Sequence, residues 1–157
     1  MTLQKILQLI RLLLGFLDSV YPSPGAIQGV TVHQTKATSF ADANDIKNFH
    51  HCRASGGSES SCFKVGDNGI GFWGDSTVSD IPMCALPVED WIDLGGDARG
   101  AIVMVTVGAI TIKCELRDTM PRRANIRNGA GLDLNAAACA RLKLSPPILV
   151  NATWWFQ

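Results

Sequence analysis

Short apolar runs separated by glycine- and proline-rich segments dominate most of the chain. Two of these runs, AIVMVTV at 101–107 and AITIKCEL at 109–116, are largely β-branched and meet at Gly108, which predicts two adjacent strands. A third run, ILVNATWWF at 148–156, predicts a final strand after a helix-stopping Ser-Pro-Pro. The pattern is typical of a mainly β domain with few helices.

Helical spacing in the body of the chain is confined to two short stretches. Residues 39–53 carry apolar side chains at helical intervals, with Asp42 or Asn44 as the N-cap. Residues 136–142 follow Asn135, which is the expected N-cap of a second short helix. Both helices are predicted to be short additions to a mainly β domain.

The N-terminal segment has a different pattern. Residues 3–17 place apolar side chains on one stripe of an amphipathic helix, and Arg11 interrupts the run that a secretory signal requires. We therefore expect residues 1–20 to form a helix that packs against copies of itself, a larger assembly or a membrane surface, the alternative being its own domain. Residues 21–38, which open with YPSPGAIQG, are predicted as a linker, and 39–157 as the β domain with a helical extension.

Composition limits the size and the partners of this domain. The chain has 157 residues, of which 46% are apolar, so it can bury one core. Lys plus Arg and Asp plus Glu both total 14, which leaves no basic surface excess for a nucleic-acid partner.

The five cysteines fit no zinc-site spacing, and His50 and His51 beside Cys52 lack a second ligand pair, so neither a metal nor another cofactor is expected. A Gly- and Ser-rich loop joins Cys52 to Cys62, which predicts a disulfide between them. Cys84 with Cys114 is the second expected pair. Disulfides indicate an oxidising, extracellular or cell-envelope location, whereas five reduced thiols in a cytosolic protein stay open as the alternative.

Candidate chemistry gathers in two places. In GDNGIGFWGDST at 66–77, the aromatic Trp73 stands close to Asp75, a pairing that suits a sugar site, although Asp75 as a turn cap is the alternative. In the C-terminal half, Asp118 lies in an RDTMP turn and Asp133 precedes a helix in GLDLNAAACARL. An Asp at such a place also serves to accept N–H bonds at the helix end, which needs no substrate.

Paired strands, the RDTMP turn, the GLDLN step into an Ala-rich helix, LSPP and a Trp-rich last strand resemble the double-psi β-barrel of rare lipoprotein A, the expansins and glycoside hydrolase family 45. The resemblance covers about residues 70–157 and implies a six-stranded barrel. It implies that Asp133 is the catalytic acid and that Asp118 lines the same groove. It also implies a sugar-contacting segment at Phe72, Trp73 and Asp75, where family 45 enzymes place their base. Gly131 and Leu132 depart from the His that often precedes this Asp in expansins.

Cleavage of a glycosidic bond requires a carboxyl that stays protonated, and Leu132 and Leu134 are expected to raise the pKa of Asp133 by desolvation. Hydrolysis also requires a second carboxylate, Asp75 or Asp118, whereas a lytic transglycosylase manages with the acid alone.

Several arginines crowd the same turn and loop. Arg117 and Arg122, with Arg123 and Arg127, are expected to contact an anionic glycan or to lower the pKa of Asp118, the alternative being a solvated loop.

Two functions follow from these features. The first is binding or cleavage of a cell-wall glycan polymer, such as peptidoglycan, by a glycoside hydrolase or lytic transglycosylase. The second is a non-catalytic structural protein that is anchored to an oligomer or a larger secreted or particle-associated assembly through residues 3–17.

Overall fold

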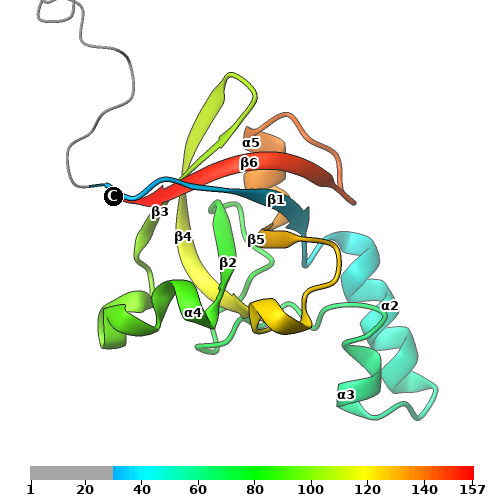
Figure 1. Cartoon of the computed structure of the whole chain (residues 1–157). Coiled ribbons are helices and arrows are strands. Elements are labelled where there is room, and N and C mark those ends of the chain that lie inside the picture. Colours follow the sequence, from blue (N-terminus) through cyan, green and yellow to red (C-terminus); the bar gives the residue numbers. More distant parts are fainter. Residues whose placement is uncertain (1–29) are drawn as a thin grey trace, which may run out of the picture. The chain divides into compact units, whose positions relative to one another are not determined.

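The computed structural model describes residues 30–157, so the helix expected over residues 3–17 lies outside the described part. Six strands close into a barrel, and short helices lie at its rim (Figure 1). The strands are β1 (His33–Ser39), β2 (Met83–Pro87), β3 (Ile102–Val107), β4 (Ile110–Met120), β5 (Ala130–Leu134) and β6 (Leu149–Phe156). The helical elements are α2 (Ala43–Ala54), α3 (Glu59–Cys62), α4 (Val88–Trp91), η1 (Ile92–Ala98), η2 (Arg123–Asn125) and α5 (Ala136–Arg141). Within residues 30–157, no helix is long and apolar enough to cross a membrane.

The strand order around the barrel is β1-β5-β2-β4-β3-β6. Two pairs, β1 with β5 and β2 with β4, are parallel, and the other four are antiparallel. Each parallel pair contains a shift of register, at which one strand carries an extra residue. This closed six-stranded barrel is the double-psi fold, so the fold expected from the sequence motifs is confirmed.

Alternation along the strands fills the barrel interior. Leu132 and Leu134 of β5 and Val103 and Val105 of β3 are fully buried in one apolar core, where each large side chain contributes roughly 1.5–3 kcal/mol to folding. Trp154 of β6 is also fully buried, and its ring stacks on His33 with the ring centroids 4.0 Å apart. The apolar runs predicted as strands are therefore confirmed as the wall of a barrel.

Asn135 joins β5 to α5 and connects three segments of the chain. Its side-chain oxygen accepts hydrogen bonds from the N–H groups of Met83 and Ala138, at 3.0 and 2.9 Å. Its amide nitrogen donates to the carbonyl oxygens of Thr77 and Ile81, at 3.1 and 3.0 Å. The predicted N-cap of α5 is confirmed, and all four bonding positions of this buried amide are used.

A disulfide closes the hairpin of α2 and α3. Cys52 and Cys62 are bonded, as predicted, and Asp42 is the N-cap of α2. Gly57 lies against the bridge, where a Cβ atom would stand only 2.6 and 2.8 Å from the two sulfur atoms. The Gly-rich loop therefore supplies room for the bridge as well as flexibility.

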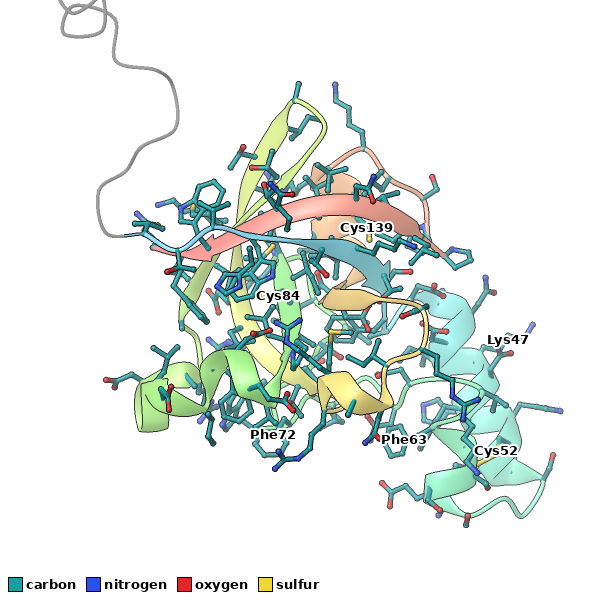
Figure 2. The ribbon with its side chains drawn as sticks, in the orientation of Figure 1. Lys47, Cys52, Phe63, Phe72, Cys84 and Cys139 are labelled. Carbon is teal, nitrogen blue, oxygen red and sulfur yellow. A yellow bond between two sulfur atoms is a disulfide. The ribbon has the colours of Figure 1, made fainter. Side chains whose placement is uncertain are left out.

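The second expected disulfide, Cys84 with Cys114, is wrong. Both residues and Cys139 carry free, buried thiols (Cys84 and Cys139 are labelled in Figure 2). All three side chains belong to the barrel core, and burial raises the pKa of each thiol above its usual value. They fill the core as small apolar groups, a use that sequence spacing does not separate from bridging.

Two further expectations need correction. Residues 33–38, which were predicted as part of a linker, belong to β1. In HQTKATS mainly polar outward residues alternate with small inward ones, and the missing apolar run explains why no strand was predicted. The RDTMP segment is the end of β4, which continues to Met120, and not a turn. The sequence patterns also left β2, α4 and η1 unpredicted. For β2 the reason is that its sequence, MCALP, is short and lacks alternation.

Candidate functional site

Asp133 and Asp118 lie on one row across neighbouring strands. Asp133 of β5 pairs with Ala85 of β2, and Ala85 pairs on its other side with Asp118 of β4. With strands 4.7–4.9 Å apart, two strand spacings separate the two Cα atoms by roughly 10 Å. We call Asp133 and Asp118 the acid pair.

Both members of the acid pair face outward because each parallel strand pair has a bulge. On β4 the register moves from Leu116 directly to Asp118, so Arg117 is the extra residue and the alternation reverses there. On β5 the register moves from Ala130 to Leu132 in the same way. Bulges of this kind redirect side chains. Without the first bulge, Asp118 would face inward beside Leu116.

A small apolar cluster surrounds the acid pair outside the barrel wall. This outer cluster consists of Phe40, Ala41, Ala85, Met120 and Ala130, with Ile46 and Ile126 packed against it. Leu132 and Leu134 instead point into the barrel core. The outer cluster, which includes Ala85 between the two carboxyls, therefore lies on the same side of the barrel wall as the acid pair.

The Asp133 side chain is half-buried, and its carboxyl is incompletely bonded. Its Oδ1 atom is shielded from solvent and has no hydrogen-bond partner among the described residues. Burial raises the pKa of Asp133 to about 7, and the negative charges of Asp118 and Asp45 add to this effect. The Thr38 hydroxyl and the Leu134 N–H oppose it. Asn135 caps α5, so the helix-end role considered for Asp133 belongs to Asn135.

Asp118 is better bonded than Asp133. Its Oδ1 accepts hydrogen bonds from the N–H groups of Phe72 and Thr119, both at 2.8 Å. Burial nevertheless raises the pKa of Asp118 to about 6, and the two N–H groups act in the opposite direction. The acid pair therefore combines a carboxyl that is protonated up to neutral pH with one that ionises earlier.

The arginines expected near Asp118 are engaged elsewhere. Arg122 lies 3.9 Å from Glu89, and Arg123 bonds to Asp90. No arginine contributes to the pKa of Asp118, which is raised, so the expected lowering of this pKa by arginines is wrong. The bulge at position 117 turns the Arg117 side chain toward Glu115 and away from the acid pair.

More carboxylates surround the acid pair. Asp45 on α2 and Asp67 in the following loop both have raised pKa values, for which burial is the main cause. The charge of Asp45 acts on Asp133, and that of Asp67 acts on Asp118. Among residues 30–157, no three metal-binding side chains come together in a geometry that would hold a metal ion.

Three aromatic rings lie beside the acid pair. Phe72, Trp73 and Trp91 contact one another, with ring centroids 5.1 to 5.8 Å apart. Phe72 is 59% exposed, and its own N–H is bonded to Asp118 (Figure 2 labels Phe72 at the surface). Trp91 was not found from the sequence, since α4 was not predicted, and its ring nitrogen donates to the carbonyl oxygen of Leu86.

Asp75 lies near this group, but its carboxylate is paired. Arg99 bonds to both oxygens, at 2.6 and 3.0 Å, and Arg117 bonds to one of them at 3.2 Å. The bonds from Arg99, followed by those from Arg117, lower the pKa of Asp75. Asp75 is therefore less suited than Asp118 to act as the second carboxylate beside Asp133.

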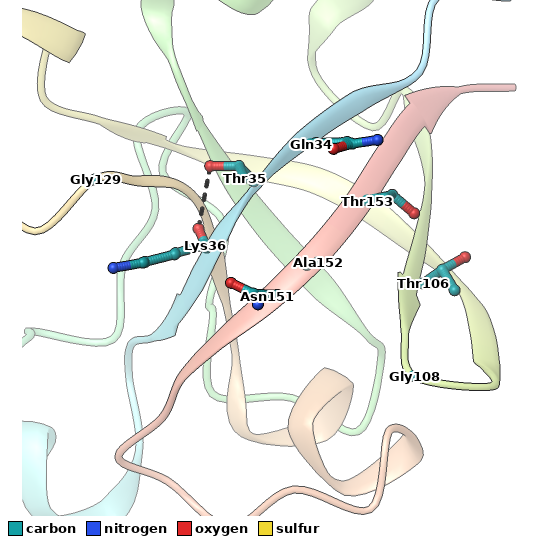
Figure 3. A pocket seen from close by; sticks show the side chains of 9 residues that line it. All are labelled: Gln34, Thr35, Lys36, Thr106, Gly108, Gly129, Asn151, Ala152 and Thr153. Atoms are coloured by element: carbon teal, nitrogen blue, oxygen red, sulfur yellow. Dashed lines mark hydrogen bonds between the residues drawn. The ribbon is translucent and has the colours of Figure 1, made fainter.

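A separate hollow of about 530 Å³ lies along β1, β6 and the turn after β3 (Figure 3). Its side chains are mostly polar, including Gln34, Lys36, Asn151 and Thr153. None of the candidate residues taken from the sequence lines it. The candidate site is instead the open surface that carries the acid pair and the aromatic rings.

No protein-family model and no curated protein matches the chain. Among solved structures, a Streptomyces papain inhibitor is 22% identical, with 80% of this chain and 94% of the inhibitor covered and a TM-score of 0.49. An expansin of Clavibacter michiganensis is 13% identical, with 81% of this chain covered and a TM-score of 0.47. A point mutant of that expansin in complex with cellohexaose is 12% identical over the same share, with a TM-score of 0.46. The chain spans 50% of the expansin's length. At these identities the similarity is one of fold alone, and the barrel's own strand order carries the fold assignment.

Proposed function

We propose that this domain binds a polysaccharide across the acid pair and the adjacent aromatic rings, and that Asp133 protonates a glycosidic oxygen. The observation that carries the proposal is the Asp133 carboxyl, whose shielded Oδ1 lacks a partner and whose pKa is about 7. A carboxyl whose shielded oxygen has no hydrogen-bond partner lowers stability, and such groups are concentrated at functional sites.

The acid pair has the chemistry for glycosidic cleavage. A general acid must hold its proton near neutral pH, and Asp133 meets this condition. Asp118, with a pKa of about 6, is ionised at the same pH and is suited to accept a proton from water. Two strand spacings, roughly 10 Å between Cα atoms, leave room for a water molecule, as inversion of the sugar requires. Peptidoglycan, our first expected substrate, stays a proposal.

The aromatic rings supply the second half of the proposed binding surface. A sugar ring stacks on an aromatic face through its apolar side, and the exposed face of Phe72 with the half-buried Trp73 offers such a platform. Arg122 lies at the rim with its guanidinium largely exposed and is available to a ligand. Arg117 is held in ion pairs with Asp75 and Glu115, and it contributes to the binding surface through these pairs. The Cys52–Cys62 disulfide supports an extracellular or cell-envelope location.

Glycan binding and release of soluble product test the proposal together. Purified peptidoglycan, cellulose and chitin are incubated with the wild type, Asp133→Asn and Asp97→Asn, which removes an exposed carboxylate of η1 outside the site. We expect wild type and Asp97→Asn to bind one glycan and release product. Asp133→Asn should bind it without release. If wild type and Asp97→Asn also bind without release, the domain is a binding module and Asp133 is not an acid catalyst, and no binding to any glycan would contradict the whole proposal.

The alternative is a non-catalytic assembly protein, and a specific surface feature favours it. Several large apolar side chains of segment 63–81 are about half exposed, namely Phe63, Val65, Ile70, Val78 and Ile81. Exposed apolar side chains that form one patch mark protein-binding surfaces. Docking through residues 3–17 stays a proposal of the same kind. Deletion of residues 1–28 should abolish oligomerisation in sedimentation velocity if this alternative holds, and an unchanged sedimentation coefficient would contradict it.

A further inference from the structure

An ion-pair network crosses the surface beside the acid pair. Asp75 bonds to Arg99 at 2.6 Å and to Arg117 at 3.2 Å, and Arg117 bonds to Glu115 at 2.7 Å. The network joins three parts of the chain, which are the loop before β2, the residue after η1 and the middle of β4. Both carboxylate oxygens of Asp75 are already bonded, so this group is poorly placed to accept a proton from water.

Asp75 belongs to a small hairpin over residues 69–77. A bridge between Ile70 and Ser76 closes the hairpin, and its tip is fixed by two bonds of 2.8 Å. The Gly71 N–H donates to the Asp75 carbonyl oxygen, and the Gly74 N–H donates to that of Gly71. Phe72 and Trp73 lie at this tip, so they belong to the same hydrogen-bonded turn as Asp75.

The same hairpin tip contacts the acid pair directly. The Phe72 N–H bonds to Oδ1 of Asp118, one residue away from Arg117, which holds Asp75. Gly71 is pressed against the β4 backbone, where a Cβ atom would stand 2.2 Å from the Arg117 carbonyl oxygen. Two adjacent residues of β4 thus fix the tip, one through its side chain to Asp75 and one through its carboxylate to Phe72.

We propose that Asp75 is a positioning residue, whose bonds to Arg99 and Arg117 hold the 69–77 hairpin so that the Phe72 N–H stays on Asp118 and Trp73 stays beside the acid pair. The catalytic meaning of this arrangement rests on the proposed function, whereas the mechanical coupling does not. The proposal replaces the role of base that the family resemblance implies for Asp75.

The experiment measures the coupling without substrate, in the full chain. Carbon-13 NMR follows the titration of the Asp118 carboxyl, and fluorine-19 NMR of 5-fluorotryptophan follows Trp73. The variants are Asp75→Asn, Asp75→Glu as the conservative rescue, and Arg99→Met, which removes the same ion pair from its 52%-exposed partner. Asp97→Asn is the control, because it removes a nearby exposed charge and leaves the network intact.

Loss of the ion pairs of Asp75 should weaken the hydrogen bond from the Phe72 N–H to Asp118. This hydrogen bond favours the ionised form of the Asp118 carboxyl. We expect the Asp118 titration midpoint to move upward and the Trp73 resonance to shift in Asp75→Asn and, less strongly, in Arg99→Met. Asp75→Glu should return both signals toward the wild type, and Asp97→Asn should change neither. Amide spectra of the barrel core confirm that each variant is folded.

Two results would overturn the proposal. One is an unchanged Asp118 titration and Trp73 signal in both Asp75→Asn and Arg99→Met. The other, which needs the glycan assay of the proposed function beside the NMR measurements, is loss of product release in Asp75→Asn alone with both signals unchanged, because Asp75 would then act on the substrate itself. Failure of the proposed function has a different signature, since the wild type would then act on no glycan while the coupling between Asp75 and Asp118 persists.

Discussion

Replacement of Asp133 by asparagine should stabilise the folded domain at neutral pH, although the residue is largely buried. The pKa of Asp133 is about 7 in the folded protein, against an ordinary value of 3.8. Below pH 3.8 both states hold the proton, so the carboxyl contributes nothing to the pH dependence. As the pH rises toward 7 the unfolded chain releases the proton first, and the folded state loses stability relative to it. A difference of about three pH units corresponds to about 4 kcal/mol, which is reached at pH 7 and constant above it.

Asparagine removes this penalty but introduces an amide with unmet hydrogen bonds. An enclosed amide without partners costs about 1–3 kcal/mol at every pH. The change with pH is therefore a sharper test than the stability at one pH. We expect the unfolding free energy of Asp133→Asn, relative to the wild type, to rise by about 4 kcal/mol between pH 4 and pH 8.

Urea unfolding followed by tryptophan fluorescence at pH 4, 6 and 8 measures this quantity, with Asp97→Asn as the control. Parallel stability curves for the wild type and Asp133→Asn across this range would refute the reasoning. They would mean that the Asp133 carboxyl is solvated or bonded in the folded state.

Three further predictions concern the site and its supports. Product release should have a bell-shaped pH profile with limbs near pH 6, where Asp118 ionises, and near pH 7, where Asp133 loses its proton, and Asp118→Asn should remove the acid limb. Asn135→Ala removes four hydrogen bonds, three of them buried, and should lower the unfolding free energy by about 3–5 kcal/mol in urea; a loss below 1 kcal/mol would contradict the connecting role of this amide. The paired change Cys52→Ala and Cys62→Ala should cost about 3 kcal/mol through the loop it reopens and leave a domain whose unfolding free energy does not respond to added reductant, whereas Cys139→Ala, which keeps the bridge, should lose stability on reduction as the wild type does. Equal sensitivity of both variants to reductant would contradict this assignment of bridges.

Local sequence signals determined the elements that carry strong patterns. β-branched runs around Gly108 predicted β3 and β4, and the residues before each helix predicted the caps of α2 and α5. The loop between Cys52 and Cys62 predicted their bridge. These features depend on neighbours within a few residues, so the sequence contains the information needed to find them.

Features that depend on packing were beyond the sequence. Cys84 and Cys114 fill the interior of a closed barrel, and only the closure of that barrel shows them to be core residues. Trp91 joined Phe72 and Trp73 through a helix whose pattern is too short to predict. The 33–38 segment was assigned to a linker because its strand character comes from pairing with β5 and β6.

The acid pair shows most clearly which features the sequence determines and which only the tertiary structure decides. The resemblance of the GLDLN step to a family motif selected Asp133, and in β5 this residue faces outward because its neighbours Leu132 and Leu134 point into the core. The same alternation, applied to β4, would place Asp118 inward with Cys114 and Leu116. The bulge at Arg117 reverses the alternation and brings Asp118 to the outer face. A bulge is determined by the register between two strands far apart in the sequence, so residue types alone identified the two carboxyls and only the tertiary structure decided that they share one surface.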